Sequence, residues 1–364
     1  MQDFDFYNSE DDFSDNYPDF FLEWDETVNT GKKPGFYEPE ELIEIIELYI
    51  LNNDINKAKQ AINYALQIYS DNEEIIYEIL LLLNDFEQWN DLLSICDQYK
   101  NNSDVWIDGH RLTALLHLGM EDEAFLFFRK LLTKHADNKD DLSICYQAMG
   151  EALGEVDLFD SSNDVIQEAI DTLKLDLNFY WIQMQNFVAL NDKEKVLELS
   201  DVLLKIDPLD PEIWYRLGIS FLEVGEIEKA IDAFENAQSL EYDPELVLKY
   251  LIFIYEKNKN FSKALEKANE FLDLFPGNYV ITMYAAKLNS HVKNWKNALK
   301  HIEEVIKITP FIESLYLYKS TFLLRMEEYK KAKLTLIEGM KNTKDSKGYL
   351  SKKLSKLNKK YPDC

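Results

Sequence analysis

A period of 34 residues runs through the later part of the sequence and restricts the folds that it can adopt. A shift of 34 brings residues 143, 177, 211, 245, 279 and 313 into one register without gaps. Mostly small residues recur at two positions of that register. The eighth position holds Gly150, Met184, Gly218, Ile252, Ala286 and Ser320, and the twentieth holds Ser162, Val196, Ala230, Ala264, Ala298 and Ala332. Periods of this length are typical of solenoids, in which each repeat packs only on its neighbours.

Each repeat is predicted to be a hairpin of two helices. Small side chains at one point on each helix let the two helices approach closely, while bulkier side chains fill the space around that point. The bulky residues stand at the fourth, eleventh and seventeenth positions and include Trp214, Phe221, Tyr255, Phe261 and Trp295. Prolines near the thirty-second position are expected to end the second helix, because proline lacks the N–H that a helix interior needs. These prolines are Pro208, Pro276 and Pro310.

One unit carries a family signature in Trp214, Leu217, Gly218, Phe221, Ala230, Phe234 and Ala237. On these residues the sequence resembles the tetratricopeptide repeat family, and the resemblance covers most of the chain. It implies an all-α fold, a right-handed superhelical solenoid of about nine tetratricopeptide hairpins. The repeats are predicted near 39–72, 73–104, 105–142, 143–176, 177–210, 211–244, 245–278, 279–312 and 313–346.

The spacing is less regular upstream, and the ends of the chain differ from the repeats. The repeat that begins at residue 105 is longer than the others, which predicts an extended loop at "DNKDDL", residues 137–142. In residues 347–364, Tyr349 or Leu350 shares one helical face with Leu354 and Leu357, which predicts a capping helix followed by a tail. Residues 330–364 hold eleven Lys and three Asp or Glu, and we interpret these lysines as the solvated face of that helix.

Residues 1–38 form an acidic segment that also contains Phe, Tyr and Trp. The segment holds eleven Asp or Glu and two Lys, and its apolar residues follow neither a helical nor a strand period. Such a composition predicts a flexible segment when it is free. Three interpretations remain open: a solubilising tail, a linear motif for another protein, or a segment that docks in the basic groove of this chain or of a second copy.

In the resembling family, the second, fifth, ninth, twelfth and thirteenth positions of each first helix face the concave groove. At these positions the N-terminal units are acidic to neutral, whereas the last three full units carry several cations. Such a patch is unexpected in a chain with a net charge of -28. Tyrosines also recur here at the sixth position. The residues predicted to bind a peptide in this groove are Trp181, Tyr215, Lys249, Tyr250, Phe253, Lys257, Tyr284, Lys287, Tyr318 and Arg325.

Aromatic rings beside Lys and Arg suit a peptide ligand, because rigid rings give contact area at low entropic cost and cations hold carboxylates. The alternative is that the tyrosines pack between neighbouring hairpins while the lysines are only solvated.

Several functions are disfavoured by composition and motifs. The negative charge argues against a nucleic-acid partner, because phosphates need a positive surface. There is no Gly-rich phosphate loop, HExxH, nucleophile elbow or CxxC, and Cys96, Cys145 and Cys364 show no paired spacing. His110 and His117 lie two turns apart, and we interpret them as part of a solvated helix face. No catalytic residue, metal site or cofactor is predicted.

The sequence favours a non-enzymatic scaffold or adaptor that binds a peptide segment of another protein. The alternative is a self-assembling or autoinhibited protein, in which the acidic N-terminal segment docks on the basic groove. An enzyme domain hidden in units 39–142 would require a polar pocket there, for which intact hairpins are expected to leave no room. The N-terminus lacks the basic residues and apolar run of a signal peptide, so we expect a cytoplasmic protein without a membrane partner.

Overall fold

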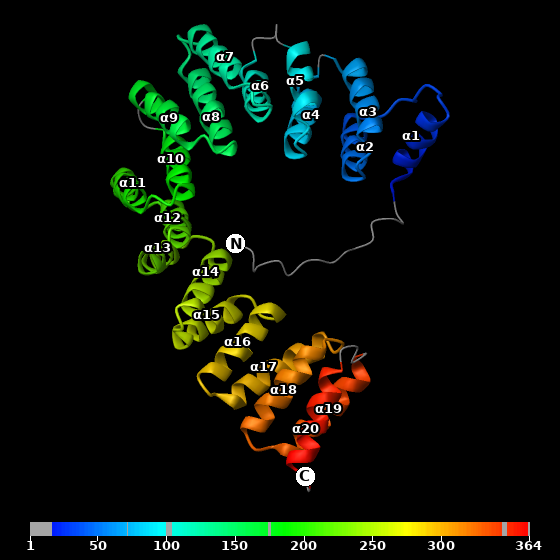
Figure 1. The fold of residues 1–364 in the computed structure, drawn as a ribbon, viewed down its shortest axis with the longest axis vertical. Coiled ribbons are helices and arrows are strands. Elements are labelled where there is room, and N and C mark those ends of the chain that lie inside the picture. Colours follow the sequence, from blue (N-terminus) through cyan, green and yellow to red (C-terminus); the bar gives the residue numbers. More distant parts are fainter. Residues whose placement is uncertain (1–16, 71, 100–103, 174–175, 344–347, 363–364) are drawn as a thin grey trace. The chain divides into compact units, whose positions relative to one another are not determined.

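The computed structural model describes residues 17–70, 72–99, 104–173, 176–343 and 348–362, and in these residues every regular element is an α-helix (Figure 1). The predicted all-α fold is therefore confirmed. The described chain divides into two compact units, and the boundary between them lies between Asn186 and Phe187. Helix α10, Leu177–Ala189, crosses that boundary in sequence.

The first unit consists of antiparallel helix pairs that follow one another along the chain. Within it α2 packs on α3, α4 on α5, α6 on α7 and α8 on α9, and the first helices α2, α4, α6 and α8 also contact one another in succession. The helices that precede α10 are α1 Asp19–Asn29, α2 Pro39–Leu51, α3 Ile55–Ile68, α4 Glu73–Asp85, α5 Trp89–Gln98, α6 Val105–His117, α7 Glu121–Lys134, α8 Lys139–Glu155 and α9 Phe159–Leu173.

The second unit repeats the same design and ends in the expected capping helix. Here α12 packs on α13, α14 on α15, α16 on α17 and α18 on α19. Helix α20 packs on α19 and buries Leu350 and Leu357. The helices after α10 are α11 Lys193–Ile206, α12 Pro211–Glu223, α13 Ile227–Ser239, α14 Pro244–Lys257, α15 Phe261–Leu274, α16 Tyr279–His291, α17 Trp295–Ile308, α18 Glu313–Arg325, α19 Tyr329–Asn342 and α20 Tyr349–Lys360.

The turn inside each hairpin uses one left-handed residue, which stands two positions after the first helix ends. A left-handed residue there lets the following N–H groups bond to the last carbonyls of the helix; Asp54 N, for example, donates to the carbonyl of Tyr49 at 2.8 Å. This cap reverses the chain at the same register position in each repeat. The residues, with φ between 52° and 76°, are Asn53, Glu87, Gly119, Asp157, Asn191, Gly225, Lys259, Lys293 and Glu327.

The helix ends follow the predicted prolines but not the predicted loop. Helices α11, α15 and α17 each end two residues before a proline, at Ile206, Leu274 and Ile308. Residues 137–142, in contrast, contain the start of α8 rather than a longer loop. The side chain of Asn138 accepts hydrogen bonds from the N–H groups of Asp140 and Asp141, and this cap begins the helix early.

The small residues of the eighth and twentieth positions lie where the two helices of a hairpin touch. A Cβ atom on Gly218 would stand 2.8 Å from the Phe234 ring, and one on Gly150 would stand 2.3 Å from Cδ1 of Ile166. At the twentieth position, Ala230 and Ala298 are fully buried. The 34-residue period therefore marks close helix contacts within each hairpin.

Part of the segment that was predicted to be flexible is folded. Within residues 1–38, the structure describes residues 17–38, and these include helix α1, which packs on α2. Trp24 is 1% exposed and meets the rings of Tyr37 and Tyr64 edge-on, at centroid distances of 5.3 and 5.2 Å. Phe21 is also buried. These aromatic residues fold because α2 and α3 supply the apolar surface that the segment lacks by itself. Residues 1–16 lie outside the described residues.

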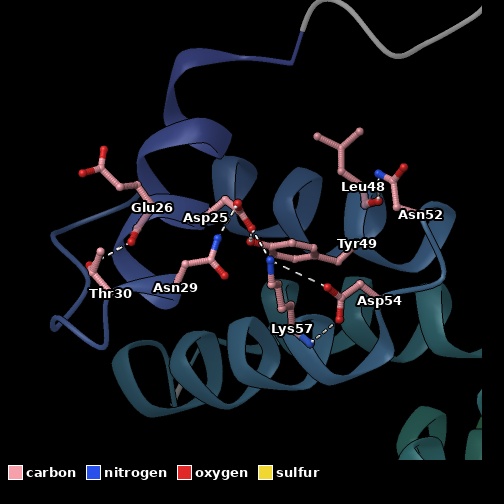
Figure 2. A network of polar contacts seen from close by, with 9 residues as sticks. All are labelled: Asp25, Glu26, Asn29, Thr30, Leu48, Tyr49, Asn52, Asp54 and Lys57. Atoms are coloured by element: carbon pink, nitrogen blue, oxygen red, sulfur yellow. Dashed lines mark hydrogen bonds and ion pairs between the residues drawn. The ribbon is translucent and has the colours of Figure 1, made fainter.

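A polar network fixes α1 at the edge of this aromatic cluster (Figure 2). Asp25 accepts hydrogen bonds from Tyr49 Oη at 2.8 Å and Asn29 Nδ2 at 2.8 Å, and its Oδ1 atom lies 2.7 Å from Lys57 Nζ. Burial raises the pKa of Asp25, but these bonds and the charge of Lys57 outweigh that effect and hold the pKa below its ordinary value of 3.8. The network therefore favours the carboxylate form.

Replacing this carboxylate by an amide should weaken the attachment of α1. We expect Asp25→Asn to lower the free energy of unfolding of the first helices by about 1–2 kcal/mol at neutral pH, because charge-assisted bonds are lost. A carboxylate with a lowered pKa contributes stability above its unfolded pKa and loses that contribution as the pH falls through the folded value. The difference from wild type should therefore close below about pH 3.8, the ordinary pKa.

Hydrogen exchange of residues 19–29 at several pH values measures this effect. Glu23→Gln, on the exposed side of the same helix, is the matched control and should change little. An equal effect of both substitutions would show that the network does not attach α1.

Candidate functional site

The residues predicted to line the groove lie on the first helices of successive hairpins, and nine of the ten belong to the second unit. Tyr215 lies on α12, four more lie on α14, two on α16 and two on α18. The tenth residue, Trp181, lies on α10 before the boundary between the units, and its side chain is buried. Its side chain therefore offers little area to a ligand.

Two of the predicted tyrosines pack between hairpins. Tyr250 stacks on Phe234, with the ring centroids 4.8 Å apart and an angle of 10° between the planes. Tyr215 meets Phe234 edge-on at 5.9 Å and stacks on Tyr242 at 4.6 Å. Burial, reinforced by Tyr250, raises the pKa of Tyr215 to about 12, so its hydroxyl stays protonated. For these two residues the structure favours the packing alternative, in which the rings support the surface.

Lys249 is compensated within its own helix. Its Nζ atom lies 2.6 Å from Oε1 of Glu245, four residues earlier on α14, and 6.0 Å from the centroid of the Phe271 ring. Glu245 therefore neutralises much of the field that Lys249 would present to a ligand. The other basic residues predicted on this surface are Lys257, Lys287 and Arg325.

Three basic residues on consecutive first helices of this unit each lie over an aromatic ring. On α14, Lys257 Nζ lies 5.2 Å from the centroid of Phe253, and on α16, Lys287 Nζ lies 5.2 Å from that of Tyr284. The guanidinium carbon of Arg325, at the end of α18, lies 5.9 Å from the centroid of Trp295. These distances are within the range of cation–π attraction. The three side chains are thereby held near the rings, which reduces the entropy that a ligand contact would cost.

The prediction omitted a cleft in the first unit. This cleft lies on α4, α6 and α8, and its lining includes Leu81, Trp106, Gln147 and Glu151. These residues occupy the ninth, second, fifth and ninth positions of their repeats, which are among the positions expected to face the groove. The register did place Glu151 on the groove side of the acidic to neutral N-terminal units, but the peptide-binding residues were predicted only in the later units.

Two classes of feature are absent from the described part of the chain. Among those residues, no group of three or more His, Cys, Asp or Glu side chains could hold a metal ion. None of the helices there is long and apolar enough to cross a membrane. Cys96 and Cys145 are unpaired and buried, and burial raises the pKa of each thiol to about 12.

Comparison with known proteins gives similarities over parts of the chain. The DnaJ homolog subfamily C member 7 homolog of Schizosaccharomyces pombe is 22% identical over 304 residues, which cover 82% of this chain and 52% of that protein. The photosystem I assembly protein Ycf3 of Rippkaea orientalis is 34% identical over 86 residues, which cover 21% of this chain and 50% of that protein. The chain spans about half the length of these curated relatives.

The repeat itself is recognised by sequence. A crystal structure of a tetratricopeptide repeat protein from Parabacteroides merdae has a TM-score of 0.39 to this chain at 14% identity, covering 75% of this chain and 98% of that one. Residues 211–244, which contain α12 and α13, match the tetratricopeptide repeat family model. Hairpins with the same left-handed turn residue recur along the described chain. Residues 211–244 of the chain therefore form a tetratricopeptide repeat, and the other hairpins resemble it.

Proposed function

We propose that this protein is a non-enzymatic scaffold whose second unit binds a segment of another protein that contains acidic and aromatic residues. The observation that carries the proposal is the series of three cation–aromatic pairs whose cations lie on α14, α16 and α18. Repeat proteins of this type bind partners on the extended surfaces that their stacked units create. A protein assembly role, as in the name of the Ycf3 relative, is compatible with such a surface.

The chemistry of the surface defines the ligand class. Lys257, Lys287 and Arg325 can each donate hydrogen bonds to a carboxylate, while the rings beneath them supply apolar contact. The chain as a whole has a net charge of -28, so a local cationic surface would attract acidic segments that most of the chain repels. The buried free thiols of Cys96 and Cys145 are compatible with a reducing compartment, and we propose the cytoplasm.

A charge-reversal variant tests the proposal. Lys257→Glu, Lys287→Glu and Arg325→Glu together should weaken binding of a physiological partner about tenfold to a hundredfold, because exposed ion pairs contribute roughly 0.2–1 kcal/mol each and reversal adds repulsion. The partner is first captured by cross-linking with the wild-type protein, identified by mass spectrometry, and then titrated against both purified proteins. Circular dichroism confirms that the variant is folded.

A second triple variant provides the matched control. Lys205, Lys296 and Lys307 are exposed on second helices of the same unit, so their replacement by Glu changes the net charge equally without touching the proposed surface. This control should bind as wild type does. Equal affinity of the partner for wild type and for the first variant would refute the proposed surface.

Self-association is the alternative function, and it would depend on docking of residues 1–16. Residues 17–38 contain α1, which is already packed on α2, so only the preceding residues offer an acidic and aromatic segment for docking. A synthetic peptide of residues 1–16 distinguishes the two functions. If the peptide binds the second unit, competes with the partner and loses affinity as salt rises, autoinhibition is favoured over a simple scaffold.

A further inference from the structure

The first unit contains a cleft of about 230 Å³ on the faces of three consecutive first helices, α4, α6 and α8. These helices follow one another in Figure 1, and α6 contacts both α4 and α8. The cleft is smaller than most sites for drug-sized ligands, so it suits one or two side chains of a larger partner. Its lining includes Leu81, Asn84, Trp106, Gly109, Ala148 and Glu151.

The cleft exists because small residues line its floor. A Cβ atom on Gly109 would stand 3.2 Å from Cβ of Ala148, which shows how closely α6 and α8 approach. With Ala148 and Ala152 opposite, no large side chain fills the space above this contact. The cleft lies across the faces of successive first helices, and half of its lining comes from α8, so it is not the polar pocket that an enzyme domain hidden in units 39–142 would require. At the cleft, Leu81 is exposed and Trp106 is 59% exposed, so a large apolar surface faces solvent.

The charged groups that line the cleft are the carboxylates of Glu151 and Glu155. The Oδ1 atom of Asn84 is buried and has no hydrogen-bond partner among the described residues. Glu151 accepts a bond from Gln147 Nε2 at 3.0 Å, and no lysine or arginine is among the residues that line the cleft. Burial and the neighbouring Glu155 raise the pKa of Glu151 although the Gln147 bond opposes them, as expected for a carboxylate without a cationic partner.

The sequence was interpreted as placing His110 and His117 on a solvated face of α6, but both side chains are half-buried in the structure. Burial lowers the pKa of His110 despite the nearby charge of Asp85, so the ring is neutral at neutral pH. His117 stacks on Trp89 with the ring centroids 3.8 Å apart, and its Nε2 atom lies 3.0 Å from Oε2 of Glu155. His110 therefore adds no positive charge to the cleft, and the surroundings are anionic.

We propose that this cleft binds an arginine side chain presented by an extended segment of a partner protein. The guanidinium group has five donors in one plane, so it can bond in a bidentate way to the carboxylate of Glu151, which lines the cleft without a cationic partner among the lining residues. Its flat face stacks on Trp106, while aliphatic neighbours in the partner segment cover Leu81. The site goes beyond the proposed function, because it selects the opposite charge from the cationic surface of the second unit.

Other occupants fit the cleft less well. An acidic or phosphorylated segment would meet Glu151 and Glu155 in a chain that is already negative. An aliphatic side chain alone would cover the carboxylate of Glu151 without offering it a donor, which is unfavourable. A lysine side chain would supply charge, but its ammonium group lacks the planar fork and the flat face of arginine.

Labelled peptides that differ in one side chain test the inference. The probe is a fluorescein-labelled decapeptide of Gly and Ser with Leu-Arg-Leu at its centre, and the comparison peptides carry citrulline, lysine or norleucine in place of arginine. Fluorescence anisotropy with the full chain measures affinity. We expect citrulline and norleucine to weaken binding at least about tenfold and lysine to weaken it less.

Protein variants connect that preference to the cleft. Glu151→Gln should reduce the affinity for the arginine peptide about tenfold and should largely remove the difference between arginine and citrulline. Glu123→Gln, an exposed change of equal charge on α7, is the matched control and should bind as wild type does. Trp106→Ala should weaken binding of the arginine and lysine peptides alike, since both lose a ring beneath the cation.

Three results would overturn the inference: no binding of the arginine peptide at millimolar concentration, equal binding of the arginine and citrulline peptides, or unchanged binding by Glu151→Gln. The triple variant of Lys257, Lys287 and Arg325 separates this site from the proposed function. It should bind the arginine peptide as wild type does, because its substitutions lie in the second unit.

Discussion

Replacing Trp24 by alanine should destabilise the start of the folded chain by about 3–5 kcal/mol, the usual cost of removing a fully buried aromatic side chain. Trp24 is 1% exposed and contacts Tyr37 and Tyr64 edge-on, so its removal leaves a cavity between α1 and the first hairpin. In a chain of stacked repeats each unit is stabilised mainly by its neighbours. The loss should therefore affect α1 to α3 most strongly and decline along the first unit.

Hydrogen exchange measured by mass spectrometry gives the free energy of opening for each helix, which suits a chain whose repeats can open separately. Leu22→Ala is the matched control, because Leu22 lies on the same helix and is 52% exposed. The control should change protection by less than about 0.5 kcal/mol, as surface substitutions usually do. Equal effects of the two substitutions, or loss of protection spread evenly over the chain, would contradict the described packing of α1.

Helix α1 has a structural role that the sequence did not reveal. The first hairpin of a solenoid has no preceding repeat to cover its apolar face, and terminal elements usually cover it. The cap at the other end was predictable, because Leu350 and Leu357 are spaced for one face of a helix and both are buried. In α1 only Phe21 and Trp24 are buried. Two residues do not establish a period, so an acidic segment with aromatic residues was interpreted as flexible.

The hairpins were predictable because the determinants of the repeat are local. Small residues such as Gly218 and Ala230 are needed where two helices that are adjacent in sequence touch. This contact recurs with the 34-residue period. The start of α8 was missed because it depends on a single cap. Asn138 accepts two N–H groups and extends the helix into residues that the repeat spacing had left as a loop.

The candidate site was less predictable, because the register specifies which way a side chain faces but not what covers it. Tyr250 packs on Phe234 of the preceding hairpin, a contact between different repeats that the period does not encode. The pairing of Lys249 with Glu245 was accessible, since residues four apart on a helix are neighbours. The cleft of the first unit exists because Gly109 and Ala148 are small. A sequence pattern does not show the space that small side chains leave open.

Two opposite ligand preferences on one chain would give a scaffold more specificity than either alone. The cationic residues of the second unit favour carboxylates, whereas the cleft around Glu151 favours a guanidinium group. A segment of the wrong charge is disfavoured at each place, which is the usual way that charged surfaces discriminate between partners. The peptide and charge-reversal experiments address the two places separately.

Replacing Phe234 by alanine should destabilise the centre of the second unit by about 3–5 kcal/mol and also disturb the candidate surface. Phe234 is 0% exposed, and its ring contacts Tyr250 and Tyr215 and lies against Gly218. Without this ring, the two tyrosines lose the surface on which they rest. We therefore expect lower protection of α12 to α15 from hydrogen exchange and weaker partner binding at temperatures where the protein is still folded.

Phe311→Ala is the matched control, because it makes the same chemical change at an exposed ring. Phe311 lies in the same unit, in the connection between α17 and α18, and is 69% exposed, so its removal should cost less than about 0.5 kcal/mol and leave partner binding unchanged. If Phe234→Ala lowers protection but leaves partner binding intact, Tyr215 and Tyr250 support the fold alone and the ligand surface is limited to the cation–aromatic pairs of α14, α16 and α18. If binding falls while protection is unchanged, the ring acts through the surface and its described burial is wrong.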